Sequence, residues 1–342
     1  MTKLLLGGSP CQGFSLARGG KQLDFNDPRS MYVQTYKQVM DQYEPDYWLF
    51  ENVMMREKPR DMISEIFGCE PIEIDAIETT PTKRKRLYWT NIPYTKGVTT
   101  GMGLNYIMQS NKEIPEHYFD SRNKVKLKDN AFEIMTDAND YRCKHIGDAT
   151  NIKGMDNIKR VYHPLGKVPT LTAMTGGHRE PFVYVSDGLY RKMTITEMER
   201  AMGMPDGYTQ YGNFDNGKRI IDGVLVDHFV EDVKHISNTQ RKKMIGNGWQ
   251  CDVIADILSG IPDAYDGLQP ELKSVVSLFD GCSCGRLALK KSGFIVRRYL
   301  ASEIDPYCSA VSRYQHPDIE HHGDVRHFVN KIPNLLIERK VA

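Results

Sequence analysis

The pattern of apolar and polar positions in residues 1–93 predicts one end of a doubly wound α/β sheet. Four short apolar runs have the length and the flanking turn residues of buried strands, at 3–7, 47–50, 72–77 and 86–91. Apolar residues at helical spacing over 30–43, and a second helical run that closes at Gly68, predict two helices between the first three strands. The order strand–helix–strand–helix–strand–strand is typical of an α/β fold.

The last part of the chain, from residue 273 to residue 342, has the pattern of a second α/β unit. Strands are predicted at Val275–Phe279 and Tyr299–Ser302, with a helix at 286–292 between them. A further helix and a third strand, ending at Asp324, are predicted after them. This is the βαβ arrangement of a parallel sheet.

The residues between these two units are less regular. Residues 94–165 are polar with weak periodicity, and 168–177 (VPTLTAMTGG) predicts a strand followed by a glycine turn. Helices are predicted at 194–202, 239–244 and 250–258. Turn residues over 260–272 predict a linker.

The composition narrows the class of protein. The 342 residues are 40% hydrophobic and 26% charged, which is ordinary for a soluble globular chain of about two domains, and no apolar run is long enough to span a membrane. Seven scattered cysteines lack disulfide or zinc spacing, which predicts a reducing compartment and no structural metal. The net charge is +1, so any surface that binds nucleic acid must be local.

The βαβ unit carries candidate cofactor chemistry. Its glycine-rich turn, with Gly281 and Gly285, would let the backbone approach a ligand at the start of a helix. Glu303 ends the next strand, where a carboxylate bonds ribose hydroxyls, and Asp324 could accept a bond from an adenine amino group. The loop is Gly-x-x-x-Gly, which favours a single adenosine over a dinucleotide. Alternatively, the two glycines only form a turn.

The first unit carries candidate catalytic residues. Cys11 follows a strand on a Gly/Pro turn, where a thiolate could act as a nucleophile, although a lone cysteine is more often inert. Glu51 ends the second strand at the edge where open α/β sheets bind ligands, or is only a helix cap. Arg84 and Arg86 could bind a phosphate or a carboxylate, or form a solvated basic run.

Together these segments resemble the DNA cytosine-5 methyltransferases. The similarity is carried by GGSPCQGFS, FENV (50–53), KRKRLYWTN, PTLTAMTGG, TITEMERAMGMPDGYT, QRKKMIGNGW, LFDGCSCG, ASEID (301–305) and GDV (323–325). It covers nearly the whole chain except about 94–160. The resemblance implies a Rossmann-like, S-adenosylmethionine-dependent methyltransferase sheet with a smaller target-recognition domain.

The resemblance also implies the role of each site residue. Cys11 would add to carbon 6 of a flipped cytosine, Glu51 would hold its N3 and amino group, and Arg84 and Arg86 would orient Glu51 and the base or its phosphate. The implied S-adenosylmethionine site consists of Pro10, Asn247, Trp249, Phe279, Asp280, Gly281, Cys282, Ser283, Gly285, Glu303, Ile304, Asp324 and Val325. No metal site is expected.

Two features depart from the family pattern. Thr82 stands where the family has glutamine before the first arginine. The cofactor motifs come last instead of first, which indicates a circular permutation. The chain is predicted to have five parts. Residues 1–93 form the catalytic half of the methyltransferase domain, residues 94–235 a target-recognition domain, and residues 236–262 helices that return to the catalytic domain. Residues 263–272 form a linker, and residues 273–342 the cofactor-binding half of the methyltransferase domain.

The sequence therefore predicts an enzyme that methylates carbon 5 of cytosine in double-stranded DNA, with basic stretches at 121–129 and 151–160 that could meet phosphates. A monomer in the cytoplasm of a prokaryotic or phage-infected cell is expected, without membrane or metal partners. The alternatives are an RNA cytosine-5 methyltransferase and a catalytically inactive DNA-binding relative.

Overall fold

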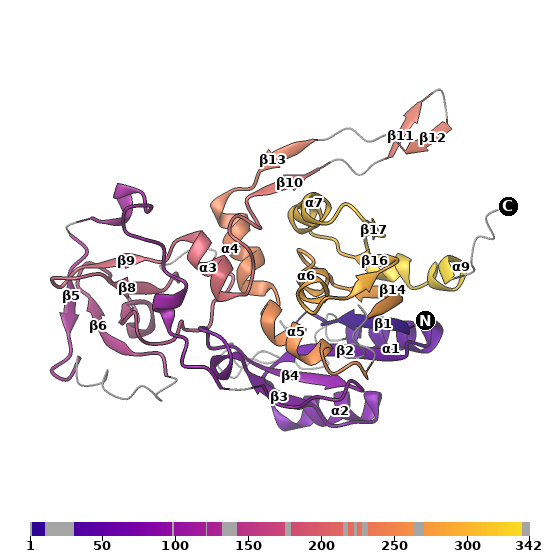
Figure 1. Cartoon of the computed structure of the whole chain (residues 1–342), viewed down its shortest axis with the longest axis horizontal. Coiled ribbons are helices and arrows are strands. Elements are labelled where there is room, and N and C mark those ends of the chain that lie inside the picture. The colour runs from indigo at the N-terminus through magenta and orange to yellow at the C-terminus, as the bar shows by residue number, and fades with distance from the viewer. Residues whose placement is uncertain are drawn as a thin grey trace.

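The computed structural model describes most of the chain, namely residues 2–10, 31–97, 99–120, 122–131, 142–174, 179–214, 218–221, 224–227, 232–262 and 270–336. The body is built on one mixed sheet (Figure 1). Its strands, in spatial order, are β17 (Ile319–His321), β16 (Tyr299–Ser302), β14 (Glu271–Leu278), β1 (Thr2–Gly7), β2 (Tyr47–Val53), β4 (Lys85–Thr90) and β3 (Ile72–Asp75), with the short β15 (Ile295–Val296) paired to β14.

The two ends of the sequence share this sheet. β1 pairs in parallel with β14 on one side and with β2 on the other, with Leu4 opposite both Val275 and Tyr47. β4 is antiparallel to its neighbours β2 and β3. The prediction that the last 70 residues and the first 93 form one sheet is confirmed, as is the predicted element order of the first unit.

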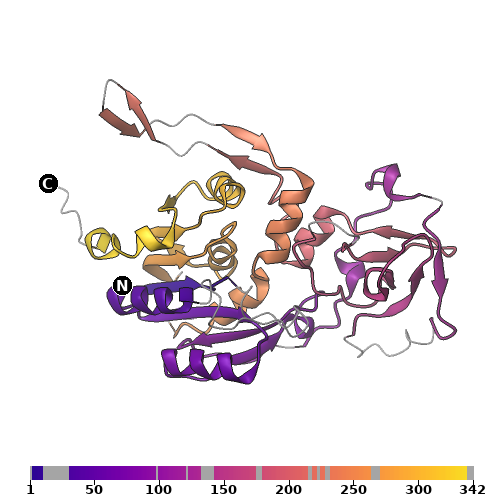
Figure 2. The same ribbon diagram turned by 180° about the vertical axis from the view of Figure 1, so that it is seen from behind.

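Helices cover both faces of the sheet (Figures 1 and 2). One face carries α1 (Tyr32–Tyr43), α2 (Glu57–Phe67), α8 (Val325–Phe328) and α9 (Ile332–Leu336). The opposite face carries α5 (Cys251–Leu258) and α6 (Cys284–Lys291). In β1, Leu5 packs into the first layer while Leu4 and Leu6 pack into the second, so the alternation of a strand places apolar side chains on both faces.

A smaller lobe extends from the body on the left of Figure 1. It contains a second sheet in the order β5 (Val125–Leu127), β6 (His145–Ala149), β7 (Arg160–Tyr162), β8 (Phe182–Tyr184) and β9 (Tyr190–Lys192). α3 (Ile195–Ala201) and α4 (Asn238–Asn247) lie between the lobe and the body. The lobe falls inside the range predicted as a target-recognition domain, and that assignment stays a prediction.

A β ribbon projects from the body near α7 (Pro306–Gln315), as both ribbon views show. It contains β10 (Tyr211–Asn213) paired with β13 (Val233–His235), and β11 (Lys218–Ile221) paired with β12 (Val224–Asp227). The sequence analysis did not predict these strands. β10 packs on α7, so the base of the ribbon lies beside the helix that connects β16 to β17.

The predicted strand at 168–177 is wrong for the residues that the structure describes there. Residues 168–174 make an isolated parallel bridge between Val168 and Thr82, but no strand. Their apolar side chains, Val168, Leu171 and Met174, are buried together against α3 and α4. The segment is therefore an extended strap whose apolar residues, three positions apart, face one core.

Candidate functional site

A cavity of about 320 Å³ lies at the carboxyl ends of β1, β2, β14 and β16. This is the edge at which open α/β sheets bind ligands, and the volume lies in the range of small-molecule sites. The cavity brings together residues from both ends of the chain. Its walls include the predicted site residues Pro10, Glu51, Arg84, Arg86, Asn247, Trp249, Phe279, Asp280, Gly281, Cys282, Glu303, Ile304, Asp324 and Val325.

The remaining predicted site residues are placed differently. Cys11 lies outside the described residues, directly after Pro10 in the cavity wall. Ser283 and Gly285 lie beneath the wall. A Cβ on Gly285 would meet the side chain of Leu6 at 3.0 Å and the Tyr299 hydroxyl at 3.2 Å, so glycine allows the start of α6 to pack on the sheet.

The loop after β14 has an unusual backbone. Phe279, Gly281 and Ser283 have φ values of 57°, 59° and 64°, which is the left-handed region that non-glycine residues seldom adopt. Such conformations persist where the surroundings hold them, and they cluster at ligand sites. A Cβ on Gly281 would meet no atom within 4 Å, so this part of the loop faces open space in the cavity.

The Asp280 carboxylate holds the loop from below. It accepts hydrogen bonds from the hydroxyls of Ser277 (2.6 Å), Ser283 and Tyr299 (2.7 Å). Burial raises the pKa of Asp280 to about 6, although these hydrogen bonds oppose the shift. The carboxylate therefore fixes the loop on the strand, while the residue also forms part of the cavity wall.

At the tip of β16, Glu303 has a fixed carboxylate. It accepts hydrogen bonds from the backbone N–H groups of Gly281 (2.8 Å), Ile304 (2.8 Å) and Asp305 (2.7 Å). Burial raises the pKa of Glu303 despite these bonds. The apolar Ile304 is 72% exposed at the cavity, which is unusual for isoleucine and would suit the face of a nucleobase.

Asp324 differs from its predicted position at the end of a strand. β17 ends at His321, and Asp324 caps the N-terminus of α8, where its carboxylate accepts from the backbone N–H of Arg326 (2.9 Å). The guanidinium of Arg326 also bonds this carboxylate and holds the pKa of Asp324 at about 2. The carboxylate of Glu303, the apolar side chain of Ile304 and the carboxylate of Asp324 thus lie around one end of the cavity. These groups fit the ribose and the adenine of an adenosine.

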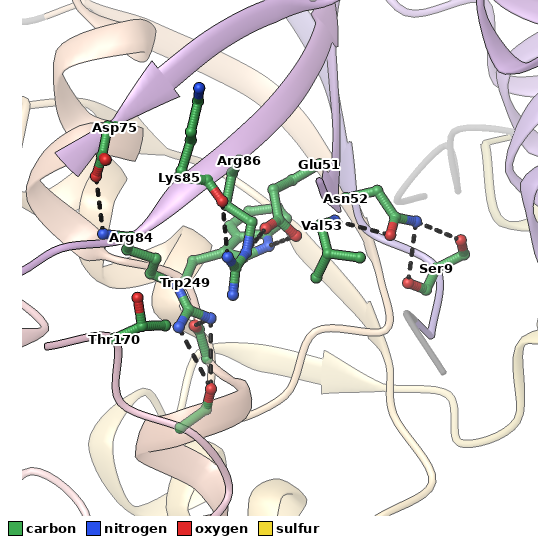
Figure 3. A network of polar contacts seen from close by, with 12 residues as sticks. Ser9, Glu51, Asn52, Val53, Asp75, Arg84, Lys85, Arg86, Thr170 and Trp249 are labelled. Carbon is green, nitrogen blue, oxygen red and sulfur yellow. Dashed lines mark hydrogen bonds and ion pairs between the residues drawn. The ribbon is translucent and has the colours of Figure 1, made fainter. Parts of the chain in front are cut away.

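The opposite end of the cavity is formed around Glu51 (Figure 3). One carboxylate oxygen is 3.0 Å from Nε of Arg86 on β4, and the other accepts a hydrogen bond from Nε1 of Trp249 at 3.1 Å. A Cβ on Gly8 would lie 2.8 Å from the backbone oxygen of Glu51, so only glycine allows the turn after β1 to approach so closely. Nearby, the Asn52 amide donates to Ser9 Oγ at 3.1 Å and fixes the same turn.

Arg84 is buried, and its contacts are structural (Figure 3). The guanidinium donates to the carbonyl oxygen of Gly248 at 2.6 Å and, at 3.4 Å, to those of Gly246 and Leu171. Burial, followed by the charge of Arg86, lowers the pKa of Arg84 to about 10. Arg84 therefore joins the end of α4 to the sheet, whereas Arg86 contacts Glu51.

The cavity wall also contains residues that the sequence analysis missed. The ring of Tyr32 lies 5.3 Å from that of Phe279, and Lys243 on α4 forms an ion pair with Asp305 at 2.7 Å. Cys284 lines the wall beside Cys282, with the two sulfur atoms 3.9 Å apart. Tyr32 and Lys243 lie within recognised helical patterns, but pattern alone does not show which helical face reaches a cavity.

None of the helices in the described part of the chain combines the length and the apolar character needed to cross a membrane. Within the same residues, no three histidine, cysteine or acidic side chains are grouped so that they could hold a metal ion.

Several known proteins are similar to parts of this chain. Residues 1–68 match the model of the C-5 cytosine-specific DNA methylases. Over 49 residues the chain is 49% identical to the orphan methyltransferase M.SPBetaI of Bacillus phage SPbeta and to the putative type II methyltransferase M.BsuMIIP of Bacillus subtilis. These alignments cover 14% of this chain and 11% of each relative. Over a longer alignment it is 25% identical to the orphan methyltransferase M.Rho11sI of Bacillus phage rho11s, covering 53% of this chain and 56% of that protein.

Two solved structures are also similar. A mutant of DNMT2 from Spodoptera frugiperda is 16% identical with a TM-score of 0.40, covering 75% of this chain and 78% of that one. The Dnmt2 methyltransferase of S. pombe is 12% identical with a TM-score of 0.42, covering 75% of each chain.

The mixed sheet with helices on both faces is a Rossmann-like α/β fold, and the cavity lies at the carboxyl ends of its parallel strands. Over residues 1–68 the chain is similar to the C-5 cytosine-specific DNA methylases, and it spans about half or less of the length of the relatives that it matches.

Proposed function

We propose that this protein transfers a methyl group from S-adenosylmethionine to carbon 5 of cytosine in duplex DNA. The observation that carries the proposal is one cavity with two chemically different ends. One end has the carboxylate of Glu303 and the apolar Ile304, which suit an adenosine. The other has the carboxylate of Glu51 and lies beside Pro10, the residue before Cys11.

The residues of this chain would act on the base as follows. The Cys11 thiolate forms a bond to carbon 6 of a flipped cytosine while Glu51 gives a proton to N3, so that the ring becomes an enamine. S-adenosylmethionine would supply an electrophilic methyl group to carbon 5 and leave as S-adenosylhomocysteine. A base, such as a water molecule, removes the proton from carbon 5, and the bond from Cys11 to carbon 6 breaks with its electron pair returning to sulfur. N3 then returns its proton to Glu51, which restores the aromatic ring.

The cofactor end of the site has its own proposed roles. Glu303 would accept bonds from the ribose hydroxyls, Ile304 would pack on the adenine and Asp324 would accept from its amino group. Phe279, Asp280, Gly281, Cys282, Val325, Pro10 and Asn247 would complete the wall, and Ser283 and Gly285 would support the loop from below. The smaller lobe would contact the DNA and select the target site.

Methyl transfer and covalent attack can be tested together. DNA from cells that express the protein should contain 5-methylcytosine by bisulfite sequencing, and the purified protein should label duplex DNA in preference to tRNA. A duplex with 5-fluorocytosine should trap a covalent complex, because fluorine cannot leave as a proton does.

Cysteine variants identify the nucleophile in the same assay. Cys11→Ala should abolish trapping while S-adenosylmethionine still binds, whereas Cys69→Ala, outside the cavity wall, should trap like the parent protein. Labelling of tRNA alone would favour an RNA methyltransferase, and absence of labelling on both substrates would favour an inactive relative.

A further inference from the structure

Trp249 occupies the space between the two ends of the cavity. Its indole N–H donates to Glu51 at 3.1 Å, and the far edge of its six-membered ring lies 3.5 Å from the position that a Cβ on Gly285, in the first turn of α6, would take. Trp249 also packs against the buried residues of two separate hydrophobic clusters. The ring therefore lies near the first turn of α6 at one edge and contacts the carboxylate of Glu51 at the other.

We propose that Trp249 is a positioning residue for Glu51, a role that rests on the proposed function. Arg86 on β4 and Trp249 after α4 hold different oxygens of the same carboxylate, at 3.0 Å and 3.1 Å. Two donors from separate elements fix the plane of the carboxylate as well as its position. Since a carboxylate oxygen accepts more than one hydrogen bond, each oxygen can still bond the base.

The indole N–H also has an electrostatic role in this proposal. Glu51 becomes an anion when its proton passes to N3 of the cytosine. An N–H group already directed at the carboxylate stabilises that charge without reorganisation during the reaction. Trp249 would therefore act on the rate of the chemical step more than on the binding of cofactor or DNA.

The backbone that carries the indole is itself fixed. Arg84 donates to the carbonyl oxygen of Gly248, the residue before Trp249, at 2.6 Å. One turn earlier, a Cβ on Gly246 would lie only 1.9 Å from the carbonyl oxygen of Thr172, so the end of α4 is packed tightly on the strap at 168–174. A rigid backbone and a ring with few rotatable bonds are suited to holding a carboxylate in place.

The test is to replace Trp249 with Phe, which keeps an aromatic ring and removes the N–H. The loss of one hydrogen bond to a charged group should lower kcat for methyl transfer by about tenfold or more. The Kd for S-adenosylmethionine by calorimetry and the KM for duplex DNA should stay within about twofold. Trp249→His, with a smaller ring that keeps an N–H, should recover part of the lost kcat.

The chain offers a matched control. Nε1 of Trp89 donates to Ser64 Oγ at the same distance of 3.1 Å, and Trp89 is fully buried against α2, away from the cavity wall. Trp89→Phe removes an equivalent indole hydrogen bond. It should lower stability to denaturant but leave kcat unchanged.

A double-mutant cycle shows whether the effect passes through Glu51. In a Glu51→Gln background, Trp249→Phe should change the residual rate by less than about threefold, because the anion that the N–H stabilises is no longer formed. Wild-type kcat in Trp249→Phe, or an equal loss in both backgrounds, would overturn the inference. A parent protein that methylates no cytosine in DNA would instead overturn the proposed function, and the inference with it.

Discussion

Asp280 places an ionisable group in the core directly beneath the loop that follows β14. Burial raises its pKa from 3.8 to about 6, so the folded protein binds the proton more tightly than the unfolded chain does. The stability contributed by this group is therefore fully present below about pH 4 and is lost as the pH rises through about 6. The difference of about two pH units corresponds to a free energy on the order of 3 kcal/mol.

Asp280→Asn should reveal this contribution, because the amide cannot ionise. The free energy of unfolding of the parent, relative to the variant, should fall between pH 4.5 and pH 7.5. Urea unfolding of both proteins across this range measures the difference. A difference that does not change with pH would mean that Asp280 titrates in the folded protein much as it does in the unfolded chain.

At the residue scale, the sequence indicated the site better than it indicated the contacts. Residues predicted to bind the cofactor, such as Glu303 and Ile304, follow directly from strand ends, which local pattern reveals, and both line the cavity. The hydrogen bond between Trp249 and Glu51 joins residues 198 positions apart, and no local signal records it. Arg84 and Arg86 are identical side chains two positions apart, but Arg84 precedes β4 and reaches the end of α4, whereas Arg86 lies within β4 and reaches Glu51.

At the scale of the element, Arg84 is the link between α4 and the sheet. The last carbonyl groups of a helix have no partners within the helix, and here a buried guanidinium binds those of Gly246 and Gly248. Arg84→Ala would leave these acceptors buried without their donor. The expected loss is roughly 2–4 kcal/mol in the free energy of unfolding.

Denaturant unfolding measures this loss. Lys83→Ala, at the exposed neighbouring position, is the control and should stay within about 0.5 kcal/mol of the parent. If both variants unfold at the same denaturant concentration as the parent, the contacts of Arg84 do not stabilise the end of α4.

The elements themselves were predictable where the periodicity was strong. The strands and helices of the main sheet follow their apolar patterns closely. The strap at 168–174 was predicted as a strand because it is rich in Val, Leu and Thr, yet it packs between other elements and pairs only at Val168. The strands of the smaller lobe have three to five residues each, too few for an alternating pattern to appear.

At the scale of the whole molecule, the order of the chain differs from the order of the sheet. The central neighbours β14 and β1 are parallel and come from opposite ends of the sequence, with six residues of β1 paired to β14. In the family that this chain resembles, the cofactor motifs precede the catalytic ones. We therefore propose that the chain is a circular permutation of the family order, opened between β17 and β1.

The positions of β1 and α9 make the reverse rearrangement feasible. The start of β1 lies close to α9 in both ribbon views, and α9 packs on α1. A short linker could join these points, which lie at the surface. Moving residues 263–342, which include all of β14, in front of Met1 through a Gly/Ser linker should give a protein that binds S-adenosylmethionine and methylates DNA like the parent. The new connection from β17 to β1 would complete a parallel sheet in the family order.

Separating the two halves gives the sharpest test of the shared sheet. Residues 1–262 alone would expose the edge of β1, where Leu4, Leu5 and Leu6 are fully buried in the intact protein. An apolar strand without its neighbour favours aggregation, so this fragment should be poorly soluble and inactive. Co-expression of residues 263–342 should restore solubility and methyl transfer, because a covalent connection contributes mainly effective concentration. If residues 1–262 fold and bind S-adenosylmethionine unaided, the cofactor half of the sheet does not need β14, and the permutation proposal fails.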